Sequence, residues 1–165
     1  RAGDRAVVDQ RRLVGAAAGL KTGIPLYAPG FLTDGTLDAM GGAGDGLLTA
    51  LHYADGLENA KDKAFRTRYA IAYKLQPDVF AVQGYDAAQL LAAGVAGVKG
   101  DLGKRAELVK AMETAKVDSP RGAFQLSRAH NPIQDIYLRK VEGRENKVIS
   151  VVSKALADPS RGCKM

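Results

Sequence analysis

Residues 77–88 read Pro-Asp-Val-Phe-Ala-Val-Gln-Gly-Tyr-Asp-Ala-Ala. Pro77 suits the first turn of a helix, and apolar residues recur after it at helical spacing as far as about Gly100. We therefore expect a mostly buried helix here. Gly84 lies inside it and costs about 1 kcal/mol relative to alanine, so a close backbone approach or a nearby ligand is expected to offset that cost.

Helices and strands alternate on both sides of this segment. Asp34 is expected to cap a short helix, and the helix that starts at Asn59 carries Phe65, Tyr69 and Ala72 on one apolar face. The last two strands are expected to form a hairpin. Further helices are expected at 4–20, 34–40, 59–75 and 104–115, and strands at 24–27, 47–53, 124–126, 136–141 and 147–152.

This order of elements predicts an α/β fold. An α/β unit normally opens with the strand that feeds its first helix, whereas this chain opens on a helix. The missing strand suggests a fragment of a longer protein. Such a fragment is expected to self-associate, or to pair with the missing N-terminal half, because its absent strands would leave apolar faces uncovered.

The composition is that of a globular chain. Of the 165 residues, 46% are hydrophobic and 25% are charged, which excludes a disordered or collagen-like protein. The net charge of +6 raises the question of nucleic-acid binding. However, basic and acidic residues alternate along 58–68, as on an ordinary solvated helix face, so no nucleic-acid partner is expected.

Residues that could carry out catalysis or bind a metal are sparse. Cys163 is the single cysteine, so no disulfide can form within the chain, although pairing with a cysteine elsewhere in a longer chain stays open. His52 and His130 are far apart in sequence, and the glycines at 41–46 match no phosphate-binding motif. We expect no catalytic residue, no metal site, no cofactor and no enzyme activity. The remaining interpretation is a binding protein.

Three stretches are more specific than the rest: Gly-Tyr-Asp-Ala-Ala at 84–88, Asp-Ser-Pro-Arg-Gly at 118–122, and Ala-His-Asn-Pro-Ile-Gln-Asp-Ile-Tyr at 129–137. With the order of the elements around them, they closely resemble the C-terminal half of the periplasmic solute-binding proteins of branched-chain amino-acid type ABC transporters. The resemblance covers nearly the whole chain. It implies the C-terminal part of a two-lobed type I periplasmic-binding-protein fold, with three-layer α/β lobes and three hinge crossings, incomplete in this chain.

The resemblance also implies a division of the chain and a function. Residues 1–51 would belong to the second lobe, residues 52–138 to the first, and residues 139–165 would return to the second. The protein would be the periplasmic component of an ABC importer. It would hold a small amino-acid-like or aromatic carboxylate ligand between its lobes and interact with a membrane permease. A ligand-sensing regulatory domain of the same fold is the alternative.

The candidate ligand contacts are Phe31, Phe80, Gln83 and Gly84. Phe80 matches a cleft-lining aromatic of the family, Gln83 and Gly84 lie one helical turn on, and Phe31 follows a strand at its carboxyl end. Ordinary core packing is the alternative for both phenylalanines. Amino-acid binders of the family carry an acidic residue where Ala6-Val7 stand here, and 130–137 resembles relatives that take aromatic carboxylic acids.

Overall fold

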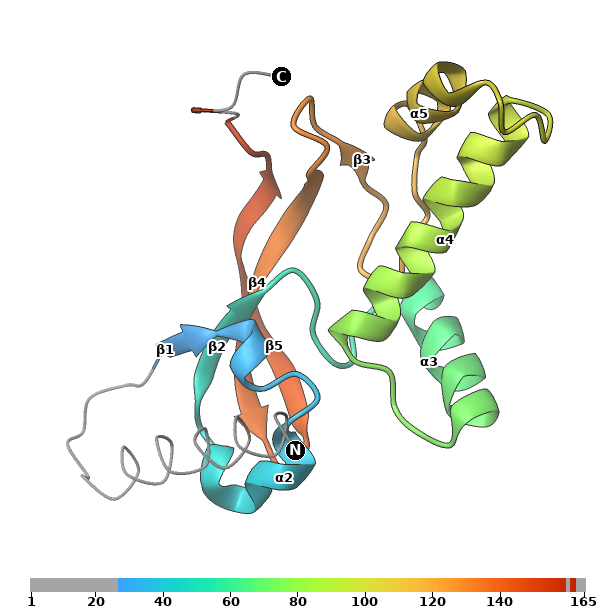
Figure 1. The fold of residues 1–165 in the computed structure, drawn as a ribbon. Helices are drawn as coiled ribbons and strands as arrows, with labels where there is room; N and C mark the ends of the chain where they lie inside the picture. The colour runs from blue at the N-terminus through green and yellow to red at the C-terminus, as the bar shows by residue number, and fades with distance from the viewer. Residues whose placement is uncertain (1–26, 160, 163–165) are drawn as a thin grey trace, which may run out of the picture. The chain divides into compact units, whose positions relative to one another are not determined.

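The computed structural model describes residues 27–159 and 161–162 (Figure 1). The expected helix at 4–20, the start of the expected strand at 24–27, and Cys163 lie outside these residues. The chain forms two compact units. The first unit contains the described residues up to Gly56 together with Ile136–Val152, and the second contains Leu57–Asp135 together with the described residues from Ser153 onward. The backbone therefore passes from one unit to the other three times.

The first unit is built around a mixed sheet. Strand β1 (Tyr27–Pro29) runs parallel to β2 (Leu48–Leu51), and β2 is antiparallel to β4 (Pro132–Glu142). Strand β5 (Glu145–Leu156) pairs with β4 as the expected hairpin, and both strands continue into the second unit. The short elements η1 (Gly30–Leu32), α2 (Leu37–Met40) and η2 (Gly41–Gly44) connect β1 to β2.

A small apolar core supports this sheet. Its buried side chains are contributed by α2, by the residue that precedes β2 and by the end of β4, with Ala28 and Leu32 packed against them: Leu37, Met40, Leu47 and Val141. In the β2–β4 ladder Thr49 lies opposite Arg139. This register brings a charged side chain into the interior of the unit, where Arg139 is fully buried.

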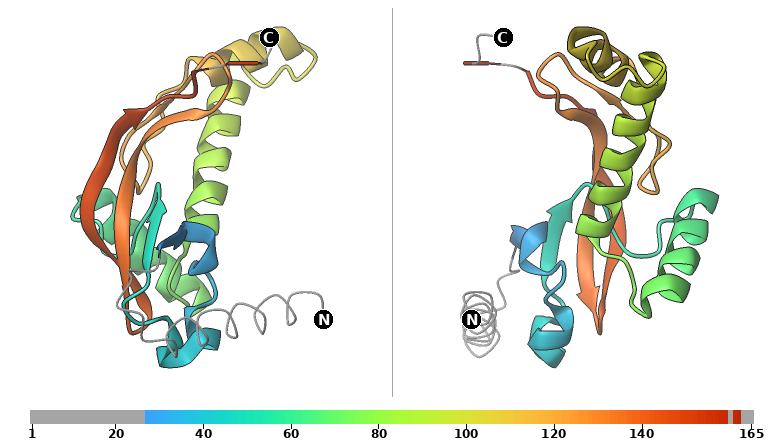
Figure 2. Two further views of the ribbon diagram at one scale, coloured as in Figure 1. Left: turned by 90° about the vertical axis from the view of Figure 1, so that its left-hand side faces the viewer. Right: turned by 45° about the vertical axis from the view of Figure 1, so that its right-hand side comes forward.

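The second unit is mainly helical. Helix α3 (Ala60–Tyr73) is capped by the side chain of Asn59, and α4 (Val79–Gly97) is capped by that of Asp78. Helix α5 (Arg105–Glu113) packs against α4, as both views in Figure 2 show. Strand β3 (Gln125–Leu126) pairs with the first residues of β4. None of the helices in the described part of the chain combines the length and apolarity that a membrane crossing requires.

Close packing of α4 on α5 depends on glycine. A Cβ atom at Gly94 would lie 2.7 Å from Met112 Cγ, and one at Gly97 would lie 2.5 Å from Ala111 Cβ. Both distances are shorter than van der Waals contact, so only glycine permits this approach of the two helices. Gly84 differs, because no described atom other than its chain neighbours and the backbone of its own helix lies within 4 Å of the Cβ that it lacks. The expected close backbone approach at Gly84 is therefore wrong.

Three other expectations are corrected by the structure. Helix α4 is not mostly buried, since Phe80, Leu91 and Val95 are exposed on it. Asp34 caps no helix: α2 starts at Leu37 without a side-chain cap, and the Asp34 carboxylate instead pairs with Arg139. The strand expected to end at Tyr27 continues to Pro29, and Tyr27 is exposed.

Candidate ligand-binding site

Phe31 lies in η1, directly after the carboxyl end of β1. The backbone beside it is fixed by Gly30, whose carbonyl oxygen accepts a hydrogen bond of 3.0 Å from Arg139 Nη2. A Cβ at Gly30 would lie 2.5 Å from Leu51 Cβ, so this position requires glycine. Phe31 itself is 49% exposed. Phe31 is therefore a half-exposed aromatic side chain that follows a backbone position held by Arg139.

Arg139 connects the segments around Phe31 through hydrogen bonds. Its guanidinium donates hydrogen bonds to acceptors on β2, on η1 and in the segments that follow them: Thr49 Oγ1 at 3.1 Å, Tyr53 O at 2.8 Å, Gly30 O at 3.0 Å, Thr33 Oγ1 at 3.3 Å and Asp34 Oδ2 at 2.8 Å. Asp34 supplies the carboxylate of this set and thereby compensates the buried charge. Arg139 is completely buried, and its hydrogen bonds connect β2 and η1 with the segments that follow them.

Phe80, Gln83 and Gly84 all lie in the first two turns of α4. The start of the helix is held by Asp78 Oδ1, which accepts from the backbone N–H of Ala81 at 3.0 Å, and by the buried Val79 and Val82. Phe80 is nonetheless 53% exposed, and Gln83 and Gly84 are exposed as well. Their spacing of three and four residues places them on neighbouring positions of one helix surface.

The structure therefore brings three of the four predicted contacts together within the second unit, while Phe31 belongs to the first. Gly84 also lines a groove between α3 and α4, together with Ala81 and Tyr85. Neither Phe31 nor Phe80 is buried among the described residues, in contrast to the alternative of ordinary core packing.

A second buried network lies in the second unit and was missed at the sequence level. Asp86 Oδ2 accepts hydrogen bonds from Ser119 Oγ and from Arg121 Nε, both at 2.9 Å. Arg121 Nη1 also donates to Gln134 Oε1, and its guanidinium lies 4.3 Å from the centre of the Phe124 ring. Burial raises the pKa of Asp86, and the hydrogen bond from Ser119 and the charge of Arg121 oppose this only in part.

This network joins the three stretches of sequence that carry the family resemblance. Asp86 comes from 84–88, Ser119 and Arg121 come from 118–122, and Gln134 comes from 129–137. A signal for it was available. Asp86 follows Val79 and Val82 at helical spacing, so it lies on the buried stripe of α4 rather than on a solvated face.

The two histidines, His52 and His130, belong to different units. His130 Nε2 lies 2.8 Å from Glu113 Oε1, in a partly exposed pair at the end of α5. His52 is buried in the first unit. Across residues 27–159 and 161–162, no three His, Cys, Asp or Glu side chains come close enough together to hold a metal ion.

Comparison with known proteins identifies the class to which this fold belongs. Residues 14–146 match the family described as periplasmic binding protein. The match covers most of the chain, so the protein belongs to this family, and the resemblance noted from the sequence is confirmed. The α/β fold is the part of the periplasmic-binding-protein fold that was expected. The family is periplasmic, in agreement with the expected location.

Solved structures give more detail. A solute-binding protein of an ABC transporter from R. palustris, in complex with benzoate, is 50% identical, with a TM-score of 0.87 over 94% of this chain and 43% of that one. Another, from Rhodopseudomonas palustris BisB5 in complex with 3,4-dihydroxy benzoic acid, is 32% identical, with a TM-score of 0.76 over 88% of this chain and 41% of that one.

A leucine-binding protein from Thermotoga maritima is 19% identical, with a TM-score of 0.74 over 89% of this chain and 42% of that one, and shows likeness of fold alone. The chain thus spans less than half the length of these three relatives. A comparison with curated protein sequences gave no match.

Proposed function

We propose that the protein is the solute-binding component of an ABC importer and that its ligand is a small aromatic carboxylate. The observation that carries this proposal is the 50% identity, over 94% of the chain, to a solute-binding protein in complex with benzoate. The relative at 32% identity is also in complex with an aromatic acid. An amino-acid-like ligand is less well supported, because the leucine-binding relative is only 19% identical.

In this proposal the ligand lies between two lobes, and a membrane permease receives it. Residues 1–51 and 139–165 are assigned to the second lobe and residues 52–138 to the first. Phe31, Phe80 and Gln83 are the proposed contacts. Two exposed rings on rigidly held backbone suit stacking on an aromatic ligand, and an exposed amide suits a hydrogen bond to a carboxylate. Gly84 is assigned to the α3–α4 groove instead.

A thermal-shift titration of the protein encoded by the full gene tests this proposal. Benzoate and 3,4-dihydroxybenzoate are expected to stabilise the protein, by about 2.7 kcal/mol at a hundred times the dissociation constant, whereas leucine is expected to have no effect. Phe80→Ala is expected to weaken benzoate binding about tenfold, because a stacked aromatic pair contributes roughly 0.5–1.5 kcal/mol beyond its buried area.

Leu91→Ala is the matched control, because Leu91 is another exposed apolar residue on α4, about three turns beyond Phe80. This variant is expected to bind benzoate like the wild type. Stabilisation by leucine and by no aromatic acid would change the ligand class, and stabilisation by neither would contradict the proposed function.

A further inference from the structure

A groove of about 440 Å³ separates α3 from α4 in the second unit. Its α3 side is formed by residues spaced three and four apart, which therefore share one face of that helix, and its α4 side is formed in the same way. The lining residues are Phe65, Arg68, Tyr69, Ala72 and Tyr73 from α3, and Ala81, Gly84 and Tyr85 from α4. This is the α3 face that the sequence indicates as apolar, and it is open.

The walls of the groove are aromatic. The ring centres of Tyr69 and Tyr73 are 4.6 Å apart, those of Phe65 and Tyr69 are 5.8 Å apart, and those of Phe65 and Tyr85 are 5.1 Å apart. The chain has six Tyr and four Phe, so four of its ten aromatic side chains line this one groove. A continuous row of rings offers faces and edges on which another flat ring can stack.

At Gly84 the lining of the groove has no side chain. A glycine inside a helix costs about 1 kcal/mol relative to alanine, and the close approach that justifies Gly94 and Gly97 does not exist at Gly84. Apart from its chain neighbours and the backbone of α4, no described atom lies within 4 Å of its missing Cβ. The space that a side chain at this position would fill is part of the groove, so Gly84 keeps the groove open for an occupant.

The charge at the groove is positive. Arg68 makes no hydrogen bond or ion pair with any residue that the structure describes, so its guanidinium is available to an anion. Lys61 Nζ adds positive charge 5.5 Å from the centre of the Tyr85 ring, although it also pairs with Asp118. Guanidinium groups bind carboxylates and phosphates through two parallel hydrogen bonds, and the neighbouring rings favour an anion that carries a flat aromatic group.

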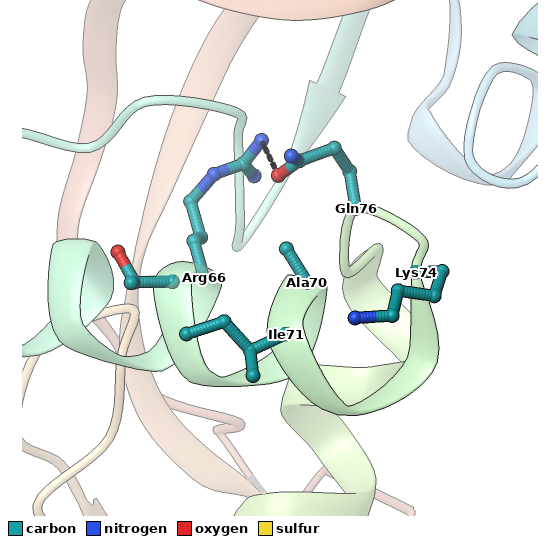
Figure 3. Close-up of a pocket in the computed structure, with 6 residues that line it drawn as sticks. Arg66, Ala70, Ile71, Lys74 and Gln76 are labelled. Carbon is teal, nitrogen blue, oxygen red and sulfur yellow. Dashed lines mark hydrogen bonds between the residues drawn. The ribbon is translucent and has the colours of Figure 1, made fainter.

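A second hollow on α3 shows the contrast (Figure 3). It is lined by Arg66, Ala70, Ile71, Lys74 and Gln76, with Thr67, and carries no aromatic side chain. The Arg66 guanidinium is already engaged, because its Nη2 donates a hydrogen bond of 3.2 Å to Gln76 Oε1. Two arginines only two residues apart on one helix therefore differ in surroundings and in engagement.

We propose that the α3–α4 groove is a binding site for a planar aromatic monocarboxylate. The ring of the ligand stacks among Phe65, Tyr69 and Tyr73 over the space at Gly84, and its carboxylate pairs with Arg68. All of the protein groups involved belong to the second unit. The site shares α4 with Phe80 and Gln83, but it uses neither of these side chains nor Phe31.

Titration of the 165-residue chain with 2-naphthoate, followed by calorimetry, tests this proposal. Arg68→Gln is expected to lower the affinity by tenfold or more, because a charge-assisted hydrogen bond is replaced by a neutral one. Gly84→Leu is expected to abolish binding by filling the groove. Arg66→Gln is the matched control and is expected to leave the affinity unchanged. The neutral analogue 2-naphthylmethanol is expected to bind more weakly than 2-naphthoate to the wild type, and equally to the wild type and Arg68→Gln.

Circular dichroism of each variant establishes that it is folded, and Gly84→Ala provides a milder obstruction that also favours the helix. Binding of 2-naphthoate that is the same in the wild type, Arg68→Gln and Gly84→Ala would overturn the proposal, as would a lack of saturable binding by the wild type. A dimer that Gly84→Leu dissociates would assign the groove to a second copy of the chain instead. Failure of the benzoate screen on the full-length protein would leave these outcomes unaffected, since Arg68 is not a proposed contact there.

Discussion

Each unit contains a buried arginine–aspartate pair within its described residues, and the two pairs are held differently. In the first unit Arg139 Nη2 lies 2.8 Å from Asp34 Oδ2, and in the second Arg121 Nε lies 2.9 Å from Asp86 Oδ2. The distances are nearly the same. The surroundings of the two carboxylates determine how much each charge contributes to the stability of its unit.

Arg139 is completely buried and donates to five acceptors, of which four are neutral oxygens and one is the Asp34 carboxylate. Removal of the negative charge would leave a buried cation without compensation. Asp86 is the weaker partner in its own pair, because its Oδ1 atom is buried and accepts no hydrogen bond from the described residues. Burial raises the pKa of Asp86, which means that its charged form is poorly stabilised.

Arg121 also has other support. It donates to Gln134 and stacks on the ring of Phe124, so it keeps contacts that do not depend on the charge of Asp86. The comparison indicates that a short distance within a buried ion pair does not establish its importance. The first unit depends on the charge of its aspartate, and the second depends mainly on shape and neutral hydrogen bonds.

The largest effect is expected for Asp34→Asn. This change keeps the size of the side chain and an acceptor oxygen but removes the charge opposite Arg139, so the free energy of unfolding of the first unit is expected to fall by about 3–5 kcal/mol. Native-state hydrogen exchange of the β2 amides measures this loss directly. Asp38→Asn is the control, because the Asp38 side chain is 79% exposed and its pairing with Arg144 contributes little. If Asp34→Asn and Asp38→Asn both had small and equal effects, the first unit would not depend on the charge of Asp34.

A smaller effect is expected for Gly30→Ala, which disturbs the same network without touching its charge. The added Cβ would lie 2.5 Å from Leu51 Cβ and 2.7 Å from Arg139 Nη2. Such overpacking costs typically about 1–3 kcal/mol, measured as a shift of the denaturation midpoint. Gly42→Ala is the matched control and is expected to be neutral, since no described atom other than those of its chain neighbours and the backbone of its own helical turn lies within 4 Å of its missing Cβ. If Gly30→Ala left the denaturation midpoint unchanged, the hydrogen bonds of Arg139 would be shown to tolerate a displacement of η1.

The helices of the second unit could be predicted from local sequence. Asn59 and Asp78 are side chains of the type that caps helices, and the apolar spacing after each of them places α3 and α4 within a few residues of their observed ends. The β4–β5 hairpin was also predictable, because strand-like residues flank the turn at Gly143. These features depend on residues that are neighbours in sequence.

The errors concern contacts between distant residues. Asp34 stands where a helix cap is plausible, but its partner is Arg139, 105 residues away in the chain. The exposed side of α4 could not be recognised because apolar residues occur all around this helix, and composition does not show which face is covered. Phe80 was selected through the family resemblance and Phe31 through its place after the carboxyl end of a strand, and the role of both as contacts stays a prediction. The sequence did contain a signal for Arg139. In β4 it is two residues from both Tyr137 and Val141, so it lies on the same face of the sheet as the buried Val141.

The smallest effect is expected for Asp86→Asn, and the direction in which this effect changes with pH separates the two pairs. Asn resembles the protonated aspartic acid in shape. Because the pKa of Asp86 is raised in the folded protein, the native state favours the protonated form more than the unfolded chain does. At neutral pH, Asp86→Asn is therefore expected to change the free energy of unfolding by less than about 1 kcal/mol, far less than Asp34→Asn.

The dependence on pH follows from the same reasoning. Below the ordinary pKa of 3.8, Asp86 is protonated in both states and the full stability is present. As the pH rises from 3.8 through the raised pKa, the unfolded chain releases its proton first, so the wild type loses stability relative to Asp86→Asn. Urea denaturation of both proteins between pH 3 and pH 7 measures this difference, at about 1.4 kcal/mol for each unit by which the pKa is raised. A wild type that instead gains stability over the variant with rising pH would show that Arg121 stabilises the charge of Asp86 as fully as Asp34 compensates Arg139, and the distinction between the two units would fail.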